Sequence, residues 1–259
     1  MPFIEIGDFR AHYALSGPAG APALVLSNSL GTNFSMWDPD LPAFEKHLRI
    51  LRYDTRGHGQ SSVTPGPYRI EQLGRDVLHI LDRLSLGRVH FCGLSLGGMT
   101  GMWIGINAPE RLQKLILCNT AARIGSAETW NARIEAVRKS GMKSVAPAVI
   151  ERWFTPAFRA AAPETTAQTQ RMMEASPAEG YVACCAAIRD MDQREAISSI
   201  NVPTLVIAGA QDAATPPADG QFLAGKIRGA RYVELPTAHL SNVEGAAQFS
   251  SEVLRFLTE

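Results

Sequence analysis

The chain has 259 residues, of which 46% are hydrophobic and 19% charged, so it holds enough apolar material for one large core or two small ones. Its 25 lysine and arginine residues balance 25 aspartate and glutamate residues, which excludes the basic excess typical of proteins that bind nucleic acid or an anionic membrane. A small molecule is therefore the expected partner.

We expect the protein to lie in the cytoplasm. No apolar run approaches the roughly 18 residues of a membrane span, and the first residues do not have the basic and then apolar profile of a signal peptide. Buried, reduced thiols are the simplest interpretation of the cysteines, because free cysteine favours protein interiors. These cysteines do not form the paired clusters of a zinc site; they are Cys92, Cys118, Cys184 and Cys185.

The first half of the chain alternates short aliphatic runs with helical patterns, as a parallel sheet with crossover helices requires. Residues 3–6 and 12–16 predict an N-terminal hairpin. Further strands are expected at residues 23–27, 48–53, 89–93 and 115–118. Apolar residues recur at spacings of three and four over residues 70–84, which predicts a helix, and a second helix is expected over 97–107.

The pattern changes between residues 124 and 192, where strand signals vanish, alanine is abundant and four prolines separate helical stretches. We interpret this segment as a helical cap inserted into a core domain of residues 1–123 and 193–259. The core pattern resumes with strands at 203–209 and 231–235 and a closing helix over 243–257. The sequence thus predicts an α/β fold with a mostly parallel sheet, helices on both faces and a helical cap.

A G-x-S-x-G pentapeptide, centred on Ser95, stands where a predicted strand ends and a helix begins. Such a sharp turn needs neighbours without side chains, and it projects the serine hydroxyl from the carboxyl edge of the sheet. The pentapeptide alone occurs by chance in roughly one chain in ten of this length. Its interpretation as a nucleophile therefore depends on partner residues elsewhere in the chain.

A serine nucleophile needs a base and a third group that orients the base, and on such a sheet the chain order is serine, acid, histidine. His239 is the one histidine of six that follows Ser95, and it lies just past the strand at 231–235. Asp212 follows the strand at 203–209 by three residues, whereas Asp219 comes after two prolines, at the start of a predicted helix. We therefore predict a catalytic triad of Ser95, Asp212 and His239.

Acyl transfer also needs hydrogen-bond donors for the developing oxyanion. The first expected donor is the backbone N–H of Leu96, the residue after the nucleophile. The second is the N–H of Leu30, in the loop that follows the strand at 23–27. An ordinary strand-to-loop turn is the alternative interpretation of that second segment.

The pentapeptide, the loop Asp54-Thr55-Arg56-Gly57-His58-Gly59-Gln60-Ser61 and the triad order resemble the α/β-hydrolase superfamily over nearly the whole chain. Three further segments, residues 27–38, 187–192 and 238–242, resemble the 3-oxoadipate enol-lactonases. Most superfamily members carry His-Gly where this chain has Asn28-Ser29, and glycine where it has Ala238. Both departures favour the enol-lactonases over a generic esterase. Arg56 and His58 precede Ser95, and we interpret them as residues that structure their loop.

The resemblance implies a serine hydrolase that opens 3-oxoadipate enol-lactone to 3-oxoadipate, a step in bacterial degradation of protocatechuate or catechol, and it implies no metal or organic cofactor. A closed site should pair the carboxylate of this anionic lactone with a cation. Arg133 and Arg189 in the cap are the candidates, although most such arginines are solvated or paired with an acid. Trp130 and Ser29 are also expected to contact the substrate.

Other functions fit the same residues. Another carboxylic-ester hydrolase, a cofactor-free perhydrolase or a C–C bond hydrolase would use the same serine triad. A receptor that keeps the triad as a ligand site without turnover also remains open. An epoxide or haloalkane hydrolase is disfavoured, because those relatives carry aspartate where this chain has Ser95.

Overall fold

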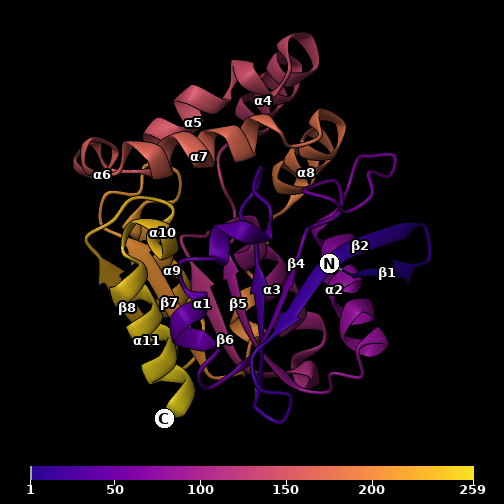
Figure 1. Cartoon of the computed structure of the whole chain (residues 1–259), viewed down its shortest axis with the longest axis vertical. Helices are drawn as coiled ribbons and strands as arrows, with labels where there is room; N and C mark the ends of the chain where they lie inside the picture. Colours follow the sequence, from indigo (N-terminus) through magenta and orange to yellow (C-terminus); the bar gives the residue numbers. More distant parts are fainter. Residues whose placement is uncertain (1) are drawn as a thin grey trace.

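A computed structural model describes residues 2–259 (Figure 1). Eight strands form one sheet in the order β1-β2-β4-β3-β5-β6-β7-β8. The strand β2 pairs antiparallel with β1 and β4, and the other neighbouring strands pair parallel. The strands are β1 (Phe3–Ile6), β2 (Phe9–Ser16), β3 (Ala23–Ser27), β4 (Arg49–Tyr53), β5 (Val89–Leu94), β6 (Leu112–Cys118), β7 (Thr204–Gly209) and β8 (Arg231–Leu235).

Helices cover both faces of this sheet, so that every residue of its inner strands β5 and β7 is buried. The helix α3 packs on β3, β5 and β6 and against α2, whereas α1 packs against α11. The apolar stripe of α2 that the sequence predicted points inward, with Leu73, Val77 and Ile80 buried. These helices are α1 (Leu41–Phe44), α2 (Ile70–Arg83), α3 (Leu96–Asn107), α9 (Pro217–Lys226), α10 (Ser241–Glu244) and α11 (Ala246–Thr258). The predicted α/β architecture is thus confirmed.

Between β6 and β7 the chain forms helices without strands, and Figure 1 shows them gathered above one end of the sheet. Ser126 begins the first of them with a reciprocal capping box to Thr129, and Gly141, at φ +71°, ends it. The α-helices are α4 (Ala127–Ser140), α5 (Ala146–Trp153), α6 (Pro156–Ala161), α7 (Pro163–Glu174) and α8 (Ala178–Asp190), and the chain's short 3₁₀ helices are η1 (Phe34–Trp37), η2 (Pro109–Arg111), η3 (Met142–Ser144) and η4 (Ala196–Ser199).

Three elements differ from the sequence prediction by more than one residue. The strand β2 begins at Phe9 rather than at residue 12, because Phe9 and Ala11 continue its buried face. The strand β6 begins at Leu112 rather than at 115. The polar Gln113 and Lys114 belong to the strand, but they precede the continuous apolar run on which the prediction rests. The closing segment is two helices, α10 and α11, interrupted at Gly245, where a Cβ atom would lie 2.8 Å from the Thr237 side chain. Over residues 2–259 we find no helix whose length and apolar character would carry it across a membrane.

Candidate active site

Ser95 stands on a strained turn between β5 and α3, with φ 56° and ψ −112°. Such a conformation costs about 1–3 kcal/mol and persists only where the surroundings enforce it. A Cβ atom on Gly93 would lie 2.2 Å from the Gly97 carbonyl oxygen, and one on Gly97 would lie 2.1 Å from that of Ser27. The Ser95 N–H donates to the Cys118 carbonyl at 2.9 Å. The two glycines are therefore required by close backbone approach.

Asp212 and His239 meet at the carboxyl ends of β7 and β8. The His239 Nδ1–H donates to Asp212 Oδ2 at 2.8 Å, which leaves Nε2 as an acceptor. The same carboxylate oxygen accepts from Thr215 Oγ1 at 2.7 Å and from Asn119 Nδ2 at 3.1 Å. Burial alone would raise the pKa of Asp212, but the charge of His239 and the hydrogen bonds from His239 and Thr215 lower it to about 2. Asp212 is thus held as a carboxylate that orients the imidazole.

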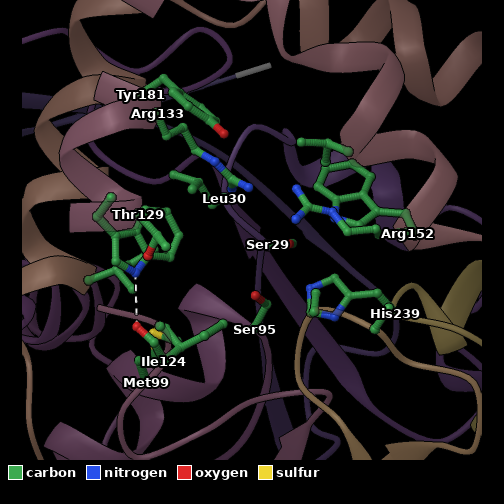
Figure 2. A pocket seen from close by; sticks show the side chains of 17 residues that line it. Ser29, Leu30, Ser95, Met99, Ile124, Thr129, Arg133, Arg152, Tyr181 and His239 are labelled. Carbon is green, nitrogen blue, oxygen red and sulfur yellow. Dashed lines mark hydrogen bonds between the residues drawn. The ribbon is translucent and has the colours of Figure 1, made fainter. Parts of the chain in front are cut away.

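Ser95 and His239 line one cavity of about 250 Å³. Figure 2 shows their side chains next to each other at the base of this cavity, which Ser29 and Leu30 also line. The indole of Trp153 stacks on the His239 imidazole, with 6.3 Å between ring centroids. The structure therefore brings together the three residues that the sequence singled out after strands β5, β7 and β8.

The loop after β3 is fixed from several directions while the Leu30 N–H stays unbonded. The Asn28 side chain donates from Nδ2 to the Tyr53 carbonyl at 2.8 Å and accepts at Oδ1 from Trp37 Nε1 at 3.0 Å. The backbone carbonyl of Asn28 accepts from the Gly97 N–H. Across residues 2–259, neither the Leu30 N–H nor the Leu96 N–H donates a hydrogen bond. Two backbone N–H groups are therefore left without an acceptor near Ser95, since Leu96 follows it in the chain and Leu30 lines the same cavity.

Arg56 and His58 hold their loop and do not line the cavity. Arg56 donates a two-pronged hydrogen bond to Asp76, at 2.8 and 2.6 Å. His58 Nε2 accepts the Gly31 N–H at 2.9 Å, and burial lowers the pKa of this histidine. Their prediction as structural residues is confirmed, and His58 supports the loop that carries Leu30.

Helices from residues 124–192 form the opposite wall of the cavity. Trp130 and Arg133 come from α4, and the guanidinium carbon of Arg133 lies 5.0 Å from the centre of the Trp130 ring. The Trp130 indole is fixed by a hydrogen bond from Nε1 to the Ile124 carbonyl at 2.9 Å, the dashed line in Figure 2. The sequence predicted these two residues at the site, and the structure places both in the cavity wall.

Arg152, which the sequence analysis did not single out, lines the same cavity (Figure 2). The ion pairs formed within residues 2–259 include neither Arg152 nor Arg133. Burial and the charge of Arg133 lower the pKa of Arg152. Two cations without a carboxylate partner therefore line the cavity, and they give its wall a positive charge. The neighbour of Arg152 in the chain, Trp153, lines the same cavity.

Arg189 lies outside this cavity, contrary to the sequence prediction. Its guanidinium donates to Asp190 at 2.7 and 2.8 Å and to Asn131 Oδ1 at 2.9 Å, and it lines a separate hollow beside residues 63–67. The physical reason is helical geometry: Ile188 faces the cavity, and the next residue of α8 points about 100° further round the helix. Arg189 is therefore paired with an acid, as the sequence analysis noted for most arginines of this kind.

The fold and the site's geometry fit one large class of enzymes. The alpha/beta hydrolase fold family matches residues 22–246, and the chain belongs to this family. It is 46% identical to 3-oxoadipate enol-lactonase 2 of Acinetobacter baylyi, over 95% of this chain and 92% of that one, and 40% identical to 3-oxoadipate enol-lactonase 1 of the same organism, over 91% and 88%. The crystal structure of the enol-lactonase from Burkholderia xenovorans LB400 matches it with a TM-score of 0.98 and 46% identity, over all of both chains. The resemblance to enol-lactonases that the sequence indicated is confirmed.

Proposed function

We propose that this protein is a serine hydrolase that opens the ring of 3-oxoadipate enol-lactone to give 3-oxoadipate. The observation that carries this proposal is the composition of one cavity, which has Ser95 and His239 at its base and two guanidinium groups without acid partners in its wall. A neutral ester would have no use for that charge, whereas the lactone carries a carboxylate. The names and similarity of the enol-lactonase relatives support the same substrate.

In the acylation step, Ser95 Oγ attacks the lactone carbonyl while His239 Nε2 takes the hydroxyl proton. The negative charge that develops on the carbonyl oxygen accepts hydrogen bonds from the N–H groups of Leu30 and Leu96. Collapse of this intermediate breaks the ring C–O bond, and the leaving enol oxygen takes the proton from His239. The ring-opened chain stays attached to Ser95 through its acyl carbon, and the enol tautomerises to the ketone, which draws the step forward.

In the deacylation step, a water molecule gives a proton to His239 and adds to the acyl carbonyl. Collapse releases the carboxylic acid and returns the proton from His239 to Ser95. Asp212 keeps the imidazole in the tautomer that both steps need, through the hydrogen bond to Nδ1. A metal or an organic cofactor has no part in this scheme.

We assign the lactone carboxylate to Arg133 and Arg152, and the apolar face of its ring to Trp130. Charge-assisted hydrogen bonds to a carboxylate are about twice as strong as neutral ones. Ser29 lines the cavity next to Leu30 and belongs to the same contact surface. Residues 124–192 act in this scheme as a cap that completes the site over a core of residues 1–123 and 193–259. Location in the cytoplasm stays a prediction.

The test is a direct assay of lactone hydrolysis, followed by loss of the lactone's ultraviolet absorbance. We expect the wild-type protein to consume the lactone with a kcat/KM at least 100-fold above that for p-nitrophenyl acetate, a neutral ester. Ser95→Ala should abolish both reactions, whereas Ser140→Ala, at the exposed end of α4, should leave both unchanged. Robust ester hydrolysis without lactone consumption would make the protein another esterase, and no turnover of either compound would favour a receptor.

A further inference from the structure

Both neighbours of His239 in the chain are bonded to groups outside their own loop. The Ala238 N–H donates to Glu244 Oε2 at 2.9 Å, and the Leu240 N–H donates to the Trp153 carbonyl at 3.1 Å. The Ala238 carbonyl accepts from Asn119 Nδ2 at 3.1 Å. The position of the histidine is therefore set by contacts on each side of it, and two of these contacts lead away from the core sheet.

Glu244 connects the histidine loop to the cap. It is the last residue of α10, and its other oxygen, Oε1, accepts the Thr155 hydroxyl. The Thr155 N–H lies 3.3 Å from each of the two carboxylate oxygens. Thr155 is buried and begins α6, where its Oγ1 accepts the Phe158 N–H at 3.1 Å. One carboxylate thus joins the His239 loop to Thr155, which lies 89 positions before Glu244 in the chain.

The cap segment that Glu244 holds also forms part of the cavity wall. Arg152 and Trp153 line the cavity and precede Thr155 by three and two residues. The Trp153 ring stacks on the His239 imidazole at an interplanar angle of 25°. Any shift of Thr155 would therefore move both the cation that faces the substrate and the ring that packs on the base.

Glu244 itself does not line the cavity, and within residues 2–259 it forms no ion pair with lysine, arginine or histidine. The hydrogen bonds to its carboxylate come from N–H and O–H groups on two different elements. Since an ionised carboxylate is an acceptor on both oxygens, it accepts from the two sets of donors at once, whereas a side-chain amide has one acceptor oxygen.

We propose that Glu244 is a positioning residue that ties the cap segment 152–155 to the His239 loop, so that the base and the wall of the cavity keep one relative placement. The inference rests on the proposed function only for the identity of the anionic substrate. The link itself acts on any reaction of Ser95, because it fixes His239 whatever the acyl group is.

The test compares Glu244→Gln and Thr155→Val with two matched controls. Glu252→Gln makes the same change on α11, where the glutamate pairs with Arg255 at the surface, and Thr155→Ser keeps the hydroxyl that Thr155→Val removes. In Glu244→Gln the amide NH₂ must face either the Ala238 N–H or the Thr155 donors, so one of the two links loses its acceptor and is weakened. Each variant is assayed on the anionic lactone and on neutral p-nitrophenyl acetate, with circular dichroism to verify folding.

We expect Glu244→Gln to lower kcat at least tenfold on both substrates and to raise KM at least fivefold for the lactone alone, because the wall carrying Arg152 shifts with the cap. Thr155→Val should raise KM for the lactone in the same way, Thr155→Ser should restore it, and Glu252→Gln should match the wild type. In the Glu244→Gln, Thr155→Val double variant the effects on lactone KM should not multiply, since either change severs the one connection that runs from Thr155 through Glu244 to Ala238.

The inference is overturned if folded Glu244→Gln stays within twofold of the wild type on both substrates, or if the two substitutions multiply independently. It is also overturned if Thr155→Ser is as impaired as Thr155→Val. Should Glu244→Gln fail to fold, the comparison of the two Thr155 variants decides. If the wild-type protein does not turn over the lactone, the proposed function fails, and kcat on the neutral ester alone then tests the link.

Discussion

Replacing Asp212 by asparagine changes one atom of the site and reverses a hydrogen-bond direction. Asp212 Oδ1 accepts the N–H groups of Ala214 and Thr215, at 2.8 and 2.9 Å, and asparagine can keep those bonds with its carbonyl oxygen. Its NH₂ group then replaces Oδ2, which in the wild type accepts from His239, Thr215 and Asn119. The amide would donate to His239 Nδ1, and the imidazole proton would move to Nε2, where it blocks acceptance of the Ser95 proton.

The size of the effect follows from this tautomer. A serine hydrolase whose histidine holds the wrong tautomer loses about 10⁴-fold in kcat, which corresponds to about 5 kcal/mol of transition-state stabilisation. We therefore expect Asp212→Asn to retain the fold and to lose between about 10³- and 10⁴-fold in kcat on the lactone. Lactone consumption under saturating substrate measures this directly.

Asp219→Asn is the matched control, since Asp219 lies seven positions further along the chain, in the first turn of α9, and does not bond to His239. Its kcat should stay within threefold of the wild-type value. An Asp212→Asn variant with more than a tenth of wild-type kcat would refute the assignment of Asp212. A large loss in Asp219→Asn with little loss in Asp212→Asn would transfer the role to Asp219.

Three further predictions follow from individual contacts. Arg152→Gln should raise KM for the lactone about 10- to 100-fold, because a charge-assisted hydrogen bond contributes about 1.5–3 kcal/mol. Its KM for a neutral ester should stay unchanged, and the surface variant Arg138→Gln should keep the wild-type KM for the lactone. An unaltered lactone KM in Arg152→Gln would contradict the assignment. Gly93→Ala should lower the free energy of unfolding by more than about 3 kcal/mol in denaturant titrations, because its Cβ would lie 2.2 Å from a carbonyl oxygen. Gly225→Ala, whose Cβ would meet no atom within 4 Å, should be tolerated. Equal stabilities of the two variants would contradict the strained turn. The pKa of Asp212 is lowered from 3.8 to about 2, so its ionisation should contribute roughly 2 kcal/mol of stability above pH 3.8, and this contribution should be lost as the pH falls through 2. An Asp212→Asn variant with the same acid unfolding profile as the wild type would contradict this.

The sequence could identify residues whose role is visible in a short motif or in their position after a strand. Ser95 sits in a motif whose glycines are dictated by backbone contacts within a few residues and with β3. His239 and Asp212 follow predictable strands, and parallel strands bring their carboxyl ends to one edge of the sheet. The alternation of strands and helices therefore placed these side chains near one another before any tertiary contact was known.

The residues that the sequence missed act across long separations. Arg152 faces the cavity only because of the way α5 packs, and the spacing of residues along that helix does not specify it. Asn119 reaches Asp212 across 93 positions of the chain, and Glu244 reaches Thr155 across 89. Arg189 shows the opposite error, since it belongs to a segment that resembles the enol-lactonases but points away from the cavity towards Asp190.

The most direct test of the central claim is to trap the acyl-enzyme during lactone turnover. Ring opening has no departing fragment, so acylation should add the mass of one whole lactone molecule to the protein. We predict that rapid acid quenching followed by mass spectrometry will find this adduct in the wild-type protein, on the peptide that contains Ser95, and will not find it in Ser95→Ala. Continued lactone hydrolysis by Ser95→Ala, or an adduct on another residue, would contradict the account.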